Sequence, residues 1–243
     1  MQLKAAALLL FLPAITAAQP SAPDITGAWS ILRAGRGGAD AKFAAPPATP
    51  MLLKSPYKEA YARRQAAERE AEAKGEPLGN RGTQCIPYGM PQMMSAIYPI
   101  EILQTPGRIT IIAEAFSEVR RIYLDQPQAQ MGDVAPGYYG HSVGHWDGGV
   151  LNVDTIGIKE DVPGYRGMPH SDHVRIKEQF KLVAPDILHD QITVEDPITL
   201  EKPWTFTFAY RRNPKYQMLE YVCENNREYI DEHGVTQLKL EDK

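Results

Sequence analysis

Hydrophobic and polar residues alternate along most of the chain after residue 98, with the period of two that is typical of β-strands. Short turns such as Pro106-Gly107, Gly148-Gly149 and Pro185-Asp186 separate the alternating runs, as expected for hairpins. Sequential antiparallel strands in this number close most simply into an up-and-down barrel or a strongly curved sheet. The candidate strands are 23–32, 99–104, 108–115, 118–124, 140–147, 150–156, 173–183, 187–195, 204–211 and 216–223.

One helix is predicted, over residues 56–74. Ser55 is a suitable N-cap, Pro56 suits the first helical position, and Gly75 supplies a C-terminal stop. The segment has few apolar residues, so we expect it to cap the outside of the barrel. We therefore predict one mainly β domain over 19–243, an antiparallel meander closing into a barrel, with a helical insertion at 50–78.

Residues 1–18 have the composition of a signal peptide. Lys4 precedes a short apolar run, and small residues lead up to Gln19. Cleavage moves the formal net charge from −4 to −5, which makes a nucleic-acid partner an unfavourable reading. No later segment is long and apolar enough for a transmembrane anchor. We expect an exported protein, periplasmic or secreted, and the oligomeric state stays open.

The chain has two cysteines, Cys85 and Cys223. In an oxidising compartment a pair of cysteines predicts one disulfide bond. The alternative is a pair of buried thiols.

Alternation in 173–183 places Val174, Ile176, Glu178, Phe180 and Leu182 on the core-facing side. A carboxylate on such a face is costly unless it is paired or protonated. If the extended conformation persists backwards, His170 and Asp172 lie on the same side near the rim. The alternative for Glu178 is a buried ion pair with Arg121.

The length of the connection 183–187 sets the register of the strand 187–195 against the strand 173–183. Leu182 then pairs with Leu188, Phe180 faces Asp190, and Arg175 meets Glu195 on the outer face. Asp190 becomes a second inward carboxylate. Asp196, in the run Glu-Asp-Pro, is predicted to cap a turn.

Aromatic residues are predicted to wall the barrel interior and to bind a ligand together with Asp190. The predicted ligand-binding aromatic residues are Trp146, Trp204, Phe206, Phe208 and Tyr210.

The stretch from Gly140 to Gly149 contains His141 and His145. Burial of Trp146 and the following apolar residues turns both histidines to the outer face. We therefore predict no metal site, and the alternative is a two-histidine, one-aspartate site on the outside.

Two classes of function follow. In the first, a cofactor-independent lyase, isomerase or hydratase acts on a small aromatic or apolar molecule. Its catalytic residues would be Glu178 as general acid or base, His170 as its counterpart, and Asp172 orienting the imidazole. In the second, a carrier uses the same cavity without turnover. A weaker third reading is an envelope-assembly factor that binds a protein through the helix. No Gly-x-Ser-x-Gly elbow surrounds Ser171, which argues against a serine hydrolase at that residue, and no Walker loop or Rossmann glycine pattern is present.

Several stretches resemble a largely uncharacterised family of exported, β-rich bacterial proteins with a lipocalin-like or calycin-like character. The matching pattern is Gly-x-Ser-x-Gly-x-Trp at 140–146, Pro-His-Ser-Asp at 169–172, and Asp-Pro followed by Lys-Pro-Trp-Thr between 196 and 205. Gly27-x-Trp29 is also similar to the opening of lipocalin-type barrels. The resemblance spans nearly the whole mature chain. It implies export and a β-rich fold, and it assigns no reaction.

Overall fold

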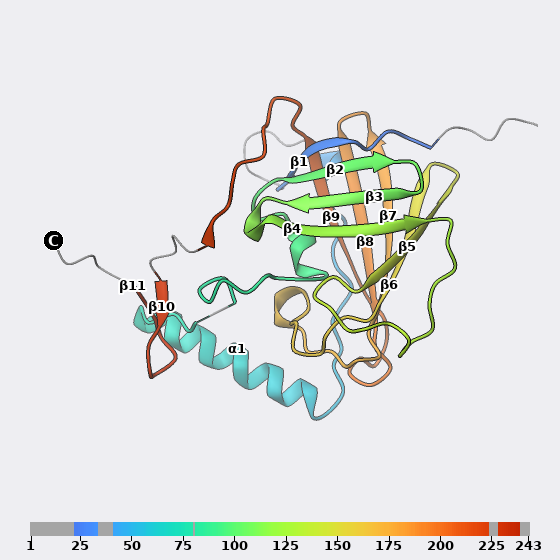
Figure 1. Cartoon of the computed structure of the whole chain (residues 1–243). Helices are drawn as coiled ribbons and strands as arrows, with labels where there is room; N and C mark the ends of the chain where they lie inside the picture. Colours follow the sequence, from blue (N-terminus) through green and yellow to red (C-terminus); the bar gives the residue numbers. More distant parts are fainter. Residues whose placement is uncertain (1–21, 34–40, 80, 224–227, 239–243) are drawn as a thin grey trace, which may run out of the picture.

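The computed structural model describes residues 22–33, 41–79, 81–223 and 228–238, so the predicted signal peptide lies outside the described residues. Nine strands form a closed barrel in which each strand pairs with its neighbours in chain order and β9 closes on β1 (Figure 1). The predicted lipocalin-like barrel with one peripheral helix is confirmed. The strands are β1 (Gly27–Ile31), β2 (Ile100–Thr105), β3 (Arg108–Ala113), β4 (Glu118–Leu124), β5 (His141–Asp147), β6 (Val150–Ile156), β7 (Arg175–Ala184), β8 (Ile187–Glu195) and β9 (Trp204–Arg212).

One strand pair departs from the predicted antiparallel meander. β4 and β5 run parallel, with Ile122 opposite Ser142 and Leu124 opposite Gly144. Residues 125–140 therefore return the chain to the end of the barrel where β4 began, as a parallel connection requires. Alternation within each strand carries no information on the direction of its neighbour, so the sequence pattern missed this reversal.

The predicted last strand, 216–223, does not form. Closure of the barrel by β1 leaves no edge for it. The segment is held instead by Glu114, whose carboxylate accepts hydrogen bonds from the Tyr216 hydroxyl and the Leu219 amide. A small hairpin, β10 (Glu228–Ile230) and β11 (Thr236–Leu238), follows and was not predicted.

The register between β7 and β8 is the predicted one. Leu182 pairs with Leu188, Phe180 with Asp190, and Arg175 with Glu195. The inward positions of β7 are buried, and the alternate positions face solvent. Alternation and turn length were sufficient here because both strands are long and their hairpin is short.

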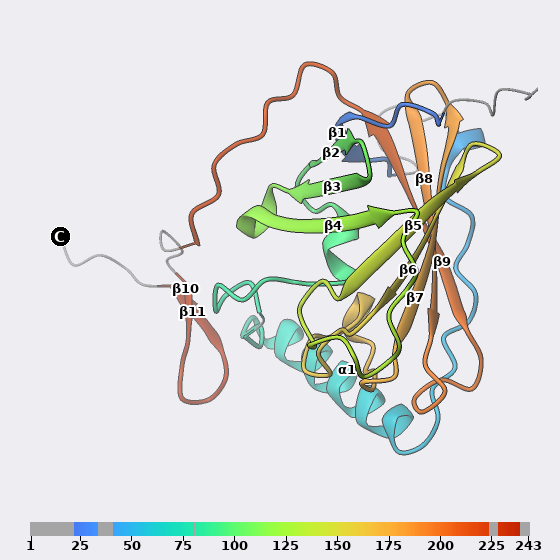
Figure 2. The ribbon, with the colours of Figure 1, turned by 45° about the vertical axis from the view of Figure 1, so that its right-hand side comes forward.

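The helix α1 (Tyr57–Lys74) lies across one end of the barrel (Figure 2), and none of its residues is buried. Gly75 ends it in the left-handed conformation, with φ of 76°, as predicted. The N-cap residue is Pro56, not Ser55. The Ser55 hydroxyl instead donates to the Glu59 carboxylate at 2.7 Å.

Four short 3-10 helices occur in the described part of the chain: η1 (Ala41–Phe43), η2 (Gln92–Ser95), η3 (Ala115–Ser117) and η4 (Tyr165–Gly167). The helices η2 and η4 pack together near the end of the barrel that faces α1 (Figures 1 and 2). The core around Trp29 is continuous from the barrel interior to the buried Met90, Met93 and Met94.

The predicted disulfide is confirmed. Cys85 and Cys223 are bonded, with their Cα atoms 5.6 Å apart, and the bond ties the 81–90 segment to the C-terminal segment. Disulfides persist in oxidising compartments, which agrees with the expected export. None of the helices in the described part of the chain is long and apolar enough to cross a membrane.

Candidate functional site

An ion pair lies inside the barrel. The Arg120 guanidinium on β4 contacts the Glu178 carboxylate on β7 through both nitrogens, with Nη1 to Oε1 at 2.7 Å, and both side chains are fully buried. Nη2 also donates to Thr155 Oγ1 at 3.0 Å and to Ser142 Oγ at 3.2 Å. Such a pair is tolerated in a core because the guanidinium and the carboxylate satisfy each other's hydrogen bonds.

This pair is the alternative that the sequence raised for Glu178, with a different partner. Alternation along β4 turns Arg120 inward with Ile122, while Arg121 is exposed. Ser142 and Thr155 are opposite each other in the β5–β6 register, and their small side chains leave space for the guanidinium.

Asp190 lies in the same interior and is fully buried. Neither of its carboxylate oxygens has a hydrogen-bond partner among the described residues. Burial raises the pKa of Asp190 well above its ordinary value. The negative charge of Glu178 raises it further, and Arg120 partly opposes the rise. The Asp190 carboxyl is therefore held toward its neutral form.

His170 is buried and held by backbone carbonyls. Its Nδ1 lies 2.9 Å from the Ser171 oxygen, and its Nε2 lies 2.5 Å from the Val162 oxygen. The predicted catalytic roles of His170, Asp172 and Glu178 require these residues to meet. Within the described chain no hydrogen bond or ion pair joins any two of them.

Asp172 does not lie on the inner face. Its side chain is 70% exposed and contacts His173 Nδ1 at 2.6 Å. Residues 172–173 form a turn and β7 begins only at Arg175, so the strand alternation does not extend back to the rim. The turn is held by Asp196, which accepts hydrogen bonds from the Ser171 amide and hydroxyl, in agreement with its predicted capping role.

The aromatic wall on β9 is buried, but another ring already covers it. Tyr165, from η4, packs at ring-centroid distances of 4.8 Å from Phe206 and 5.0 Å from Phe208, and stacks on Trp204 at 6.1 Å. The fourth ring, Tyr210, donates its hydroxyl to the Met94 carbonyl at 2.5 Å. Trp146 is half-buried, and its indole nitrogen has no partner in the described chain.

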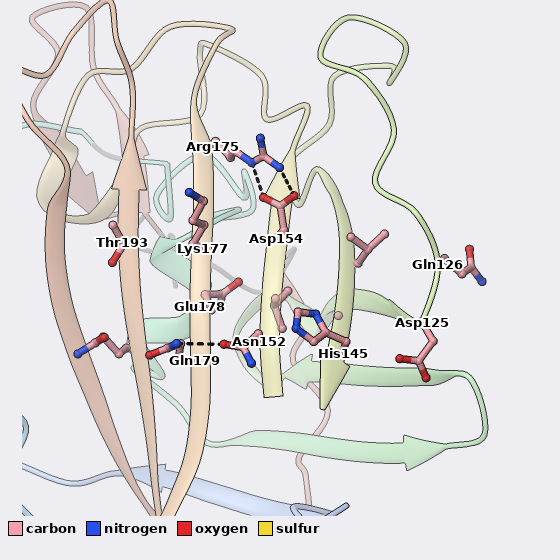
Figure 3. A pocket seen from close by; sticks show the side chains of 14 residues that line it. Asp125, Gln126, His145, Asn152, Asp154, Arg175, Lys177, Glu178, Gln179 and Thr193 are labelled. Carbon is pink, nitrogen blue, oxygen red and sulfur yellow. Dashed lines mark hydrogen bonds and ion pairs between the residues drawn. The ribbon is translucent and has the colours of Figure 1, made fainter. Parts of the chain in front are cut away.

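A groove of about 470 Å³ lies on the outer face of β5–β8, beside the segment that follows β4 (Figure 3). The strand registers arrange its side chains in two rows across the sheet. One row is His145, Asn152, Gln179 and Gln191, and the other is Val143, Asp154, Lys177 and Thr193.

The first row offers uncharged hydrogen-bonding groups. Gln179 donates through Nε2 to Asn152 Oδ1 at 3.0 Å (Figure 3), which fixes the orientation of both amides. His145 is exposed and its ring has no hydrogen bond within the described residues. The row therefore presents an imidazole and three amides, all able to contact a ligand.

Ion pairs neutralise the charges of the second row and of the adjoining Arg175. Arg175 contacts Asp154 through two nitrogens, at 2.6 Å and 2.5 Å (Figure 3). Lys177 contacts Glu195 at 2.7 Å. The two basic side chains of the groove are thus already occupied by carboxylates.

Asp125 borders the groove next to His145. Its φ of 56° is left-handed, and its amide donates to the Gly144 carbonyl at 2.8 Å, which continues the parallel β4–β5 pairing by one residue. In Figure 3 the Asp125 carboxylate faces the strands, whereas Gln126 turns away.

The strand alternation placed His141 and His145 correctly on the outer face, but that face was interpreted as solvated. The groove depends on the parallel β4–β5 pair, which brings Asp125 beside β5 and which no sequence signal indicated. His141 does not line the groove. It stacks on Tyr123 and contacts Gln128 through Nδ1 at 2.9 Å. Among the described residues, no group of three or more His, Cys, Asp or Glu side chains is arranged to hold a metal ion.

No protein-family model matches the sequence, and no curated protein matches it.

The first prediction concerns the buried ion pair. Glu178→Gln leaves Arg120 charged and unpaired in the core, so we expect the free energy of unfolding to fall by about 3–5 kcal/mol. Urea unfolding followed by tryptophan fluorescence measures the change.

The matched control removes both charges. The double substitution of Arg120 by Met and Glu178 by Leu should cost clearly less than Glu178→Gln, because no buried charge remains. Equal losses for the two variants would contradict an energetically coupled pair.

A second prediction concerns Glu118, at the start of β4. Its buried carboxylate accepts hydrogen bonds from the Tyr88 amide at 2.6 Å and the Gly89 amide at 3.2 Å. Burial raises the pKa of Glu118 to about 7, and the two amides and the charge of Arg81 only partly offset this rise. The folded protein therefore holds this proton more tightly than the unfolded chain does.

The contribution of the Glu118 proton to stability is complete below about pH 4.5, the ordinary pKa, and is lost as the pH rises through about 7. The expected loss is about 3 kcal/mol, from a shift of more than two pKa units. Urea unfolding across this pH range measures it. Glu118→Gln should flatten this part of the pH dependence, and an unchanged slope in the variant would rule out Glu118 as its source.

Proposed function

We propose that the protein is an exported, small-molecule-binding β-barrel of lipocalin-like character, and that its ligand binds in the groove over β5–β8. The observation that carries the proposal is the row of His145, Asn152, Gln179 and Gln191, which faces an open space of about 470 Å³. A volume of this size is within the range of small-molecule sites.

The ligand we propose is small, polar and without net charge, such as a saccharide or another polyhydroxylated molecule. Amide and imidazole groups both donate and accept hydrogen bonds, as hydroxyl groups do. Arg175 and Lys177 are already paired with carboxylates, so the described lining of the groove has no unpaired arginine or lysine with which to select an anion. Val143, 8% exposed, adds an apolar patch for the carbon skeleton.

Two further lines support export. The Cys85–Cys223 bond is typical of proteins outside the cytosol. The resemblance to exported bacterial proteins, together with the N-terminal signal pattern, favours a periplasmic or secreted protein.

The test is a titration of the ¹⁵N-labelled mature chain with glucose, maltose and N-acetylglucosamine. Binding is measured by the changes in the amide chemical shifts. We expect shifts that cluster on the outer face of β5–β8. The double substitution of Asn152 and Gln179 by Ala should weaken binding by about thirtyfold, because the two lost hydrogen bonds together contribute about 2 kcal/mol.

Gln217→Ala is the matched control. It removes an exposed side-chain amide that does not line the groove and that is distant in the sequence from the residues that do. Glucose 6-phosphate and glucuronate test the charge argument. Preference for these anions, or shifts located elsewhere on the barrel, would contradict the proposal.

A second candidate function is an acid/base enzyme of the lyase or isomerase type that acts in the barrel interior. The observation that favours it is Asp190, a buried carboxyl without a hydrogen-bond partner in the described chain and with a raised pKa. A group of this kind is suited to proton transfer.

Asp190→Asn distinguishes the two functions. Asparagine matches the shape and neutrality of the protonated carboxyl, so we expect the melting temperature to stay within a few degrees. If the protein is an enzyme, we expect the unaltered chain to convert small aromatic or apolar compounds and the variant not to convert them. Mass spectrometry measures the conversion. Conversion that persists in Asp190→Asn would exclude Asp190 as the proton-transfer group.

A further inference from the structure

A second pocket, separate from the groove, opens at the aromatic wall. It has a volume of about 380 Å³ and lies where the end of β1, the helix η2 and the tip of the β6–β7 loop meet β9. The residues that matter here are Ile31, Arg33, Gln92, Ile97, Tyr165 and Phe208. None of them lines the groove over β5–β8, so the two sites are independent.

The pocket has an aromatic side. The Tyr165 and Phe208 rings meet edge to face, with centroids 5.0 Å apart and planes at 82°. The Tyr165 hydroxyl makes no hydrogen bond within the described chain. Backbone hydrogen bonds within 164–168 hold the tip that carries Tyr165, and Tyr61 on α1 donates to the Arg166 carbonyl at 3.1 Å. The ring is thus a fixed surface against which a planar molecule can pack.

Other residues of the lining are apolar and partly exposed. Ile97 is 49% exposed although it lines the pocket with Ile31, so apolar surface remains in contact with water in the absence of a ligand. Gln92 donates through Nε2 to Ser95 Oγ at 3.1 Å. This hydrogen bond fixes the side-chain amide and therefore the direction of its carbonyl oxygen. Covering Ile97 with an apolar ligand would be favourable.

Arg33 is the positively charged residue of the pocket lining, and the Arg166 guanidinium lies nearby, 5.4 Å from the centre of the Tyr165 ring. Arg33 is exposed, and its side chain has no ion pair or hydrogen bond in the part of the chain that the structure describes. It differs in this respect from Arg175 and Lys177 in the groove, which are paired. An unpaired guanidinium beside aromatic rings matches a planar ligand that carries a carboxylate.

We propose that this pocket binds a small aromatic carboxylic acid, whose ring packs against Tyr165 and Phe208 and whose carboxylate pairs with Arg33. The volume accommodates one ring with a short side chain. The pocket is a binding site, and no covalent step is involved.

The experiment is isothermal titration of the mature chain with trans-cinnamate. Two analogues each remove one feature: cinnamyl alcohol lacks the charge, and trans-3-cyclohexylacrylate lacks the aromatic ring. We expect cinnamate to bind at least about tenfold more tightly than either analogue, and its affinity to fall with added salt.

Variants locate the binding. Arg33→Gln should weaken cinnamate about tenfold and leave cinnamyl alcohol unchanged, whereas Tyr165→Leu should weaken both aromatic compounds while keeping an apolar cover over the wall. Lys181→Gln is the matched control, because it removes an exposed positive charge on β7 that does not line the pocket. Thermal melting of each variant establishes that it is folded.

The proposal is overturned by an absence of cinnamate binding up to millimolar concentrations, by equal affinity for all three compounds, or by equal effects of Arg33→Gln and Lys181→Gln. Saccharide binding in the groove is measured by different probes and different variants, so the failure of either site is recognised separately.

Discussion

The structure depends on one interaction, the contact between Arg120 and Glu178 inside the barrel. A buried charge of either sign is unfavourable alone, so β4 and β7, far apart in the sequence, must be placed on facing walls. The guanidinium then requires further acceptors, and the small hydroxyl residues Ser142 and Thr155 supply them from the two strands between. Four consecutive strands are therefore fixed in register by one polar network. A shift of one residue in any of them would leave a charge or a hydroxyl on the wrong face.

The same network divides the barrel interior into two parts. The polar part lies on β4–β7, and the aromatic part lies on β9 with Tyr165 packed against it. Asp190, on β8 between Phe180 and Phe208 in register, lies at the boundary, where burial and then the nearby Glu178 charge raise its pKa and favour the neutral form. The buried pair and the packed rings occupy much of the interior. Of the two pockets that carry our proposals, one accordingly lies on the outer face, and the other lies where the end of β1, η2 and the β6–β7 loop meet β9.

Much of this could be predicted from sequence, and the limits have physical causes. Alternation identified the barrel strands and the inner face of β7, and hairpin length set the β7–β8 register, including the inward position of Asp190. The pairing of residues far apart in the sequence could not be predicted from the alternation. The pattern of β4 is the same whether β5 runs parallel or antiparallel to it, and it did not lead us to choose Arg120 over Arg121 as the partner of Glu178. Asp172 was misplaced because a turn at 172–173 breaks the alternation that we extended backwards.

On the outer face of β5–β8, the predicted side-chain orientation is correct, but it did not reveal that this face could bind a ligand. His145 faces outward, and an outward histidine on an isolated strand is most simply solvated. Three neighbours change its surroundings. The parallel β4–β5 pair brings Asp125 beside it, the β6 register places Asn152 opposite it, and Gln179 orients that amide. Since the nearby cations are neutralised by their own carboxylates, hydrogen bonding rather than net charge is the dominant property of this surface. The arrangement suits recognition of hydroxyl groups, and it arises only from the closed barrel.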